Sequence, residues 1–189
     1  MRKIDRQTIE LAANGDVSAF EDIYRAFSSA VYTIAIGITR DRGDAEEAAQ
    51  DVFLKVHRNL KSFRFGSSLG TWIYRITVNA AVNVYRRRRR NKILETVDSG
   101  SIENTIADTG DFPGDTYDKR LAVERAGKIL DKLSPEHRSC VILREIEGLD
   151  YKDMANVLGV PLGTVRSRLK RAREAMAALA AKEGINHEL

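Results

Sequence analysis

The sequence contains few of the residues that cross-link small proteins or bind metal ions in them. Among 189 residues there is one cysteine, Cys140, and there are three histidines, which lie far apart in the chain. A lone cysteine cannot form an internal disulfide, and scattered histidines lack the paired spacing of a zinc site. These counts exclude a disulfide scaffold, and we expect neither a metal nor any other cofactor.

Long apolar runs are also missing. The longest stretch, residues 30–38, is interrupted by Thr33 and Gly37. It is much shorter than the roughly 20 residues that a membrane-spanning helix needs. The first residues show no apolar segment followed by the small residues of a signal-peptide cleavage site. We therefore expect no insertion into a membrane, and a cytoplasmic location.

Proline and glycine are scarce, with 3 and 13 residues respectively. Alanine, leucine, arginine and glutamate, which favour helices over strands, are abundant. Hydrophobic residues make up 43% of the chain and charged residues 31%, which is enough for a core and a wide solvated surface. The composition predicts an all-α protein.

Charge divides the chain into three parts. Residues 1–90 carry 16 basic and 10 acidic side chains, residues 91–115 carry 1 and 6, and residues 116–189 carry 14 and 11. The middle part also holds three glycines and a proline, and has few regularly spaced apolar positions. The sequence therefore predicts two small helical domains, 1–90 and 116–189, joined by a flexible acidic linker over 91–115.

Three helices are predicted at the start of the chain. Apolar spacing favours helices over 5–14 and 17–39, with a break at residues 14–16. Asp44 is expected to open the third helix in a capping box with Glu47. One face of this third helix is polar and mostly acidic, and could be either an ordinary solvated face or a protein-docking surface. Its residues are Glu46, Glu47, Gln50 and Asp51.

The next helix carries the most informative pattern. It is predicted from about Thr71, after a loop over 63–70, and two apolar faces leave one narrow polar stripe between them. The stripe consists of Trp72, Arg75, Asn79, Asn83, Arg86 and Arg90. Rings that stack on bases, amides that bond to base edges and guanidiniums that hold phosphates suit single-stranded nucleic acid. The spacing is equally compatible with a core tryptophan and two solvated asparagines.

The C-terminal part shows the pattern of a helix-turn-helix. Ser134 and Pro135 are a strong helix start, and a short helix after Asp150 ends at Gly159. A basic helix follows from Thr164 to about residue 178. Its outward face, with Arg166, Ser167, Lys170 and Arg171, favours major-groove binding over a generic helical hairpin.

Taken together and in order, these motifs resemble a known family. Residues 44–56, 70–79, the arginine run 86–90, 133–136 and 159–173 are similar to the extracytoplasmic-function group of bacterial RNA polymerase sigma factors. The resemblance covers nearly the whole chain. It implies a promoter-recognition subunit that binds core RNA polymerase and is not an enzyme, with region two in residues 1–90 and region four in 116–189.

The resemblance also assigns residues to partners. Glu47, Gln50 and Asp51 would meet the coiled coil of the largest polymerase subunit. The separated strand of the minus-ten element would be captured by Phe63, Phe65, Ser67, Ser68, Trp72, Arg75, Asn79, Asn83, Arg86, Arg87 and Arg90. The duplex minus-thirty-five element would be read by Thr164, Arg166, Ser167, Lys170, Arg171 and Arg173. An anti-sigma factor is a further expected partner.

Two other classes of function fit the residues less well. An NTPase or metalloenzyme would need a Gly-x-x-x-x-Gly-Lys loop or a His-Glu-x-x-His pair, and neither is present. A site-specific recombinase would need a strand-rich catalytic domain. A stand-alone regulator with a receiver domain would need alternating strands and helices, whereas residues 1–90 show helical patterns throughout.

Overall fold

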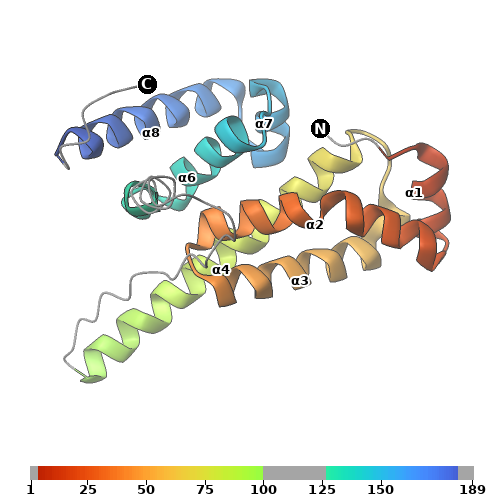
Figure 1. Ribbon diagram of the computed structural model, residues 1–189, viewed down its shortest axis with the longest axis horizontal. Helices are drawn as coiled ribbons and strands as arrows, with labels where there is room; N and C mark the ends of the chain where they lie inside the picture. Colours follow the sequence, from red (N-terminus) through yellow and green to blue (C-terminus); the bar gives the residue numbers. More distant parts are fainter. Residues whose placement is uncertain (1–3, 100–126, 183–189) are drawn as a thin grey trace, which may run out of the picture.

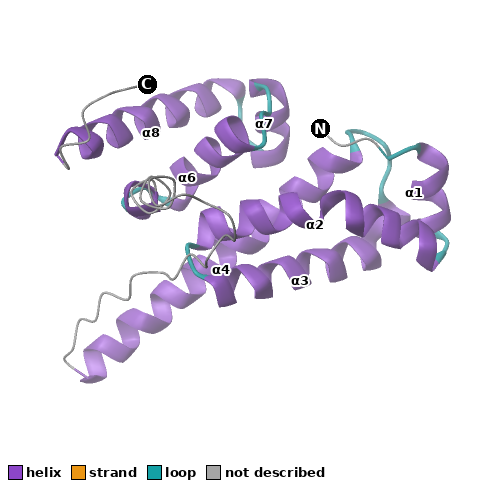
Figure 2. Ribbon diagram, viewed as in Figure 1, coloured by secondary structure: helices purple, strands orange, loops and turns teal. Residues whose placement is uncertain are grey.

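The computed structural model describes residues 4–99 and 127–182, and all regular elements in these two ranges are helical. Figure 1 shows the order of the helices, and Figure 2 shows the short loops that join neighbouring helices within each of the two ranges. The prediction of an all-α fold is confirmed over the described residues.

The first domain is a bundle of three long helices with a short one across its end. Its elements are α1 (Arg6–Ala13), α2 (Val17–Thr39), α3 (Arg42–Asn59), the 3₁₀ turn η1 (Leu60–Ser62) and α4 (Leu69–Ser99). Helices α2, α3 and α4 pack against one another, and α1 packs on α2. Asp5 and Asp16 cap α1 and α2, so both predicted helix starts are confirmed.

Helix α3 begins at Arg42, and its N-cap lies three residues before the predicted capping residue. Its N-cap is Asp41, whose side chain accepts a 3.0 Å hydrogen bond from the backbone N–H of Asp44. Asp44 therefore lies in the first turn, and Glu47 pairs with Arg87 rather than with the helix start. The predicted capping box was wrong because Asp41 and Asp44, three residues apart, both match the sequence pattern of a helix N-cap. The buried stripe of α3 consists of Ala45, Ala48, Val52 and Val56.

Replacing Asp41 with alanine is expected to lower the free energy of unfolding by about 1–2 kcal/mol, because the helix loses its cap. Asp44→Ala is the matched control. It removes a carboxylate that also pairs with Arg88 but does not cap the helix, so its cost should be about 0–1 kcal/mol. Urea denaturation followed by circular dichroism measures both. Equal losses in the two variants would contradict the assignment of the cap to Asp41.

Helix α4 is longer than predicted at both ends. It starts at Leu69, and the hydroxyl of Ser68 accepts a 3.0 Å hydrogen bond from the backbone N–H of Thr71. It runs to Ser99, so residues 91–99 of the predicted linker are helical. No glycine or proline interrupts residues 91–99, which explains why the helix continues despite the shift in composition. The rest of the predicted linker, 100–115, lies outside the described residues.

In its described part, residues 127–182, the second domain is helical over 127–131 and then has four further helical elements. These are α6 (Pro135–Val141), the π-helical turn η2 (Ile142–Ile146), α7 (Tyr151–Leu158) and α8 (Leu162–Lys182). The predicted caps are confirmed: Ser134 accepts from the N–H of His137, and Asp150 accepts from that of Asp153. Gly159 ends α7 with a positive φ of 63°.

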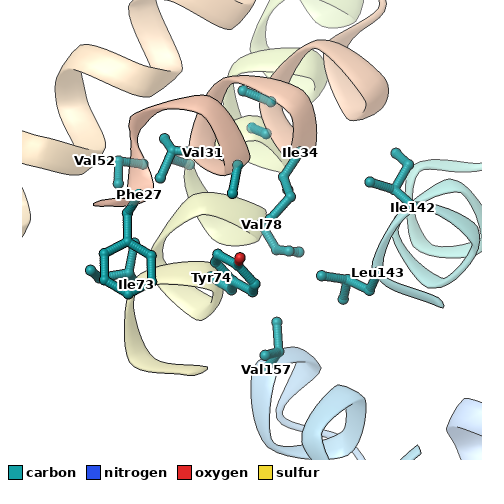
Figure 3. Close-up of a cluster of buried hydrophobic side chains, with 14 of the residues drawn as sticks. Phe27, Val31, Ile34, Val52, Ile73, Tyr74, Val78, Ile142, Leu143 and Val157 are labelled. Carbon is teal, nitrogen blue, oxygen red and sulfur yellow. The ribbon is translucent and has the colours of Figure 1, made fainter. Parts of the chain in front are cut away.

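The two domains share one apolar core. Helix α2 packs against α6 and η2, and α4 packs against α6 and α7. Figure 3 shows Ile142, Leu143 and Val157 of the second domain pointing toward the side chains of α2 and α4, among them Tyr74 and Val78. The interface places the helix-turn-helix beside the first part of α4.

Candidate nucleic-acid interface

The polar stripe of α4 is exposed from Arg75 onward. Arg75, Asn79, Asn83, Arg86 and Arg90 are all open to solvent. The flanking faces are buried as predicted, with Ile73 and Ala80 on one side and Tyr74, Val78 and Ala81 on the other. The amides are therefore accessible to a ligand, and the helix backbone beneath them is fixed by packing on both sides.

Trp72, at the start of the stripe, is half-buried in an aromatic cluster. The centroid of the Phe63 ring lies 5.3 Å from that of Trp72 and 5.0 Å from that of Phe65. Phe65 has a positive φ of 55°, a conformation that few residues other than glycine adopt. This backbone turns the loop so that two phenylalanines and the tryptophan meet at the end of the stripe, where a base could stack.

Two loop serines differ in role. The Ser68 hydroxyl lies 2.8 Å from that of Thr71 and accepts the helix-start hydrogen bond, so it has a structural task. Ser67 is exposed. The sequence analysis missed Arg6, whose guanidinium carbon lies 4.5 Å from the centroid of the Phe65 ring. No motif links α1 with the loop, because the contact depends on how the two segments pack.

The arginine run is partly neutralised within the protein. Arg86 pairs with Glu136 at 2.7 Å and Arg87 with Glu47 at 2.5 Å, while Arg88 pairs with two acidic residues at the start of α3. The hydrogen bond to Glu47 raises the pKa of Arg87. Arg87 and Glu47, predicted to bind DNA and polymerase respectively, thus contact each other. Both assignments stay predictions.

The predicted polymerase-binding face borders an apolar groove between α2 and α3. The groove encloses about 810 Å³. Its lining residues are Phe20, Tyr24, Ser28, Tyr32, Glu46, Ala49, Gln50, Phe53, Leu54 and His57. Tyr24 and Leu54 are about half exposed and both line the groove, so their apolar atoms are accessible to a partner there.

Gln50 therefore lies on the groove wall, whereas Asp51 pairs with Lys55 at 2.6 Å. The sequence showed the polar residues of α3 but not the groove. Four of the ten lining residues come from α2, and the two helices meet only in the folded chain.

The helix-turn-helix presents its basic face to solvent. Arg166, Ser167, Lys170 and Arg171 are exposed, and Thr164 is half-buried. The residues Val165, Leu169 and Ala172 on the inner side of α8 are buried, which fixes the orientation of this face. Arg173 pairs with Glu145 at 2.7 Å, a contact that raises its pKa. Its charge is therefore partly compensated before any ligand binds.

Neither a metal centre nor a membrane span is found in the described parts of the chain. Residues 4–99 and 127–182 contain no group of three or more His, Cys, Asp or Glu side chains that could hold a metal ion. None of the helices in these two ranges has the length and apolar character to cross a bilayer. Cys140 is buried, and burial raises the pKa of its thiol to about 11.

Two family models match the chain, one in each domain. Sigma-70 region 2 matches residues 23–91, and Sigma-70, region 4 matches residues 124–176. Helix α1 lies outside the first match, and α4 continues beyond it.

Curated proteins match over almost the whole chain. The RNA polymerase sigma-H factor of Pseudomonas aeruginosa is 34% identical over 183 residues, covering 91% of both chains. The ECF RNA polymerase sigma-E factor of Haemophilus influenzae is 32% identical over 176 residues, covering 90% of this chain and 92% of that protein.

Among solved structures, the sigma factor RpoE of Bartonella quintana, crystallised with the anti-sigma factor NepR, is similar in fold. It is 27% identical with a TM-score of 0.69, and the match covers 87% of this chain and 98% of that one.

Proposed function

Because the chain belongs to the extracytoplasmic-function (ECF) group of RNA polymerase sigma factors, we propose that each interface described above has one task in promoter-specific initiation. The chain binds core polymerase, brings it to a promoter and assists strand opening. The polymerase supplies catalysis, and this subunit supplies specificity. Its place of action is the cytoplasm, where core polymerase and the chromosome are found.

The exposed stripe of α4 is the observation that carries this proposal. It joins an aromatic cluster at one end to exposed amides and arginines along the helix. Opening a base pair costs a few kcal/mol, and stacking on an aromatic side chain returns about 1–3 kcal/mol per base. The stripe is thus suited to holding the minus-ten strand once it has separated, with Asn79 and Asn83 bonding to base edges.

The other two interfaces complete the activity. The α2–α3 groove, with Gln50 on its wall, docks the coiled coil of the largest polymerase subunit. Asp51 and Glu47 lie on the polar border of this surface. The basic face of α8 reads the minus-thirty-five element as duplex, because its side chains project from a helix that is anchored on its other side.

Regulation by an anti-sigma factor is part of the proposal. The Bartonella quintana relative was crystallised with such an inhibitor. We expect a comparable protein to bind this chain and to block its access to core polymerase or DNA.

Reconstituted transcription tests the function directly. Purified chain added to core polymerase on genomic DNA should yield transcripts that start at a limited set of positions with common upstream sequences. Core polymerase alone, on the same DNA, is the control. The proposal fails if the start positions are the same with and without the chain, or if the chain does not co-elute with core polymerase.

Two arginines of α8 are expected to differ in their response to DNA sequence. Arg166 lies near the start of the exposed face, where a helix in the major groove reaches base edges. Arg166→Ala should therefore weaken binding to the preferred duplex by about 1–3 kcal/mol and reduce the base preference at one base pair. Arg173 lies farther along and is held by Glu145. Arg173→Ala should weaken binding to all duplexes equally. It should also reduce the slope of log affinity against log salt concentration by up to about one unit.

Fluorescence anisotropy with cognate and scrambled duplexes measures both variants of the full chain. Lys152→Ala, an exposed lysine on α7, is the matched loss of one positive charge. A base-reading role for Arg166 would be disproved by equal losses on the two duplexes.

A further inference from the structure

The loop that carries Phe63 and Phe65 has little backbone support of its own. In the part of the chain that the structure describes, no backbone–backbone hydrogen bond involves residues 64–67. Phe65 nevertheless has a φ of 55°, whereas the glycine that follows it does not have a positive φ. The left-handed region is unfavourable for a phenylalanine by itself, so the conformation persists only where side-chain contacts hold it.

Helix α1 supplies one of these contacts. The guanidinium carbon of Arg6 lies 4.5 Å from the centroid of the Phe65 ring, a distance typical of a cation–π contact. The same helix packs on η1, the turn that leads into the loop. Two segments that are far apart in the sequence therefore meet beside the aromatic cluster.

The position of Arg6 is fixed by its own helix. Arg6 is the first residue of α1, directly after the N-cap Asp5, and Ile9 anchors the helix in the core. The Nε atom of Arg6 donates a 2.7 Å hydrogen bond to Glu10, one turn further along. This bond favours one direction of the guanidinium, so the charge that faces Phe65 comes from an anchored element.

Phe65 connects Arg6 to the tryptophan of the stripe. Its ring centroid lies 5.0 Å from that of Phe63, which lies 5.3 Å from that of Trp72. Phe65 is 39% exposed, whereas Phe63 and Trp72 are half-buried. Phe65 is thus the ring of the cluster that is most open to a nucleic-acid strand, and a displacement of Phe65 would also change the surroundings of Trp72.

We propose that Arg6 is a positioning residue of the minus-ten interface: it holds Phe65 in its left-handed conformation, so that the aromatic cluster is arranged for stacking before the separated strand arrives. This inference rests on the proposed function and extends that interface to α1, which lies outside residues 23–91 matched by Sigma-70 region 2. A preformed stacking surface binds more tightly, because fewer side chains have to be ordered on binding.

Strand binding by the polymerase complex tests the proposal. Core polymerase saturated with each variant chain is titrated with a fluorescein-labelled single strand that carries the minus-ten sequence common to the mapped start positions. Arg6→Ala should bind this strand about two- to fivefold more weakly, the effect of one exposed cation–π contact. Arg25→Ala is the matched control. Arg25 pairs with Glu21 at the same spacing and nearly the same exposure as Arg6 with Glu10, and none of the described aromatic rings lies under it.

A double-mutant cycle shows whether Arg6 acts through Phe65. In a Phe65→Ala background, Arg6→Ala should have no further effect, because the ring that it holds is gone. Arg6→Lys keeps the charge but loses the planar face of the guanidinium, so it should restore only part of the affinity. The slope of log affinity against log salt concentration should be unchanged by Arg6→Ala, since a positioning residue displaces no counterion from the strand.

Two results of this cycle would overturn the proposal. One is an equal loss of affinity from Arg6→Ala in both backgrounds. The other is full affinity of Arg6→Lys together with a shallower salt slope of Arg6→Ala, which would make Arg6 a phosphate contact.

Trp72 provides a second readout, which needs no DNA. It is the only tryptophan of the chain, so the fluorescence of the free protein reports on the aromatic cluster alone. Arg6→Ala should make Trp72 more accessible to acrylamide, an uncharged quencher, whereas Arg25→Ala should leave the quenching unchanged. Circular dichroism verifies that both variants keep their helices. Equal quenching of the two variants would contradict the positioning role.

The proposed function and the role of Arg6 fail in different ways. If the complex with the unaltered chain does not bind the strand, or if Asn79→Ala binds it equally well, the function assigned to the stripe is wrong. If the unaltered chain binds and Asn79→Ala binds weakly, while Arg6→Ala matches Arg25→Ala, only the role of Arg6 is wrong.

Discussion

Replacing Asn79 with alanine is expected to reduce promoter opening by about 5- to 150-fold, which corresponds to the roughly 1–3 kcal/mol of one bidentate base contact. Asn79 is exposed in the middle of the α4 stripe, between two buried faces. The change removes an amide without disturbing the core, so binding to the duplex upstream element should be preserved. Permanganate reactivity of unpaired thymines, measured with polymerase and the variant chain, reports opening directly.

Two further variants make this result interpretable. Asn91→Ala removes an exposed amide from the same helix outside the stripe, and it should open promoters normally. Trp72→Phe keeps an aromatic ring against Phe63, so it should retain more opening activity than Trp72→Ala. Normal thymine reactivity with Asn79→Ala would mean that the stripe does not hold the separated strand.

Most of the helices could be predicted because their signals are local. Ser134 followed by Pro135, Asp150, and Gly159 with its positive φ each act within one turn of the helix that they delimit. Such contacts depend only on neighbouring residues, so the sequence contains all the information. The inner stripes of α3 and α8 follow from the 3.6-residue period for the same reason.

The partners of charged residues could not be predicted. Five consecutive arginines indicate a basic surface, yet Arg86, Arg87 and Arg88 each pair with a carboxylate at least 40 residues away in the chain. Sequence shows where charge is located, but neutralisation depends on which helices meet. This limit explains why Arg87 and Glu47 were assigned to different partners although they contact each other.

Contacts between domains were missed for a related reason. Arg138 has no sequence feature that distinguishes it from a surface arginine of an amphipathic helix. Its burial requires the carbonyl of Ile38 on α2 and the turn around Leu130 to be brought together. Gly37 was interpreted only as an interruption of an apolar run, whereas in the fold it makes room for Ile142. Both residues acquire their role from tertiary packing.

The groove between α2 and α3 provides the other large expected effect. Leu54→Glu should weaken binding to core polymerase by about 30-fold or more, the 2 kcal/mol or more that defines an interface hot spot. Leu54 is 55% exposed and lines the groove, so a carboxylate there would have to be desolvated when a partner helix docks. Because the side chain is already open to solvent, folding should change by no more than about 0.5 kcal/mol.

The control for this variant is Val17→Glu, which places the same charge on an apolar residue that is 81% exposed and outside the groove. Size-exclusion co-elution and competition binding with core polymerase measure both variants. Asp51→Arg distinguishes the border from the groove: it should have a smaller effect, because Asp51 is already paired with Lys55 and does not line the groove. If Leu54→Glu and Val17→Glu bind core polymerase equally well, the docking surface lies elsewhere. In that case, a strong loss of polymerase binding with Asp51→Arg alone would place the docking surface on the polar border of α3.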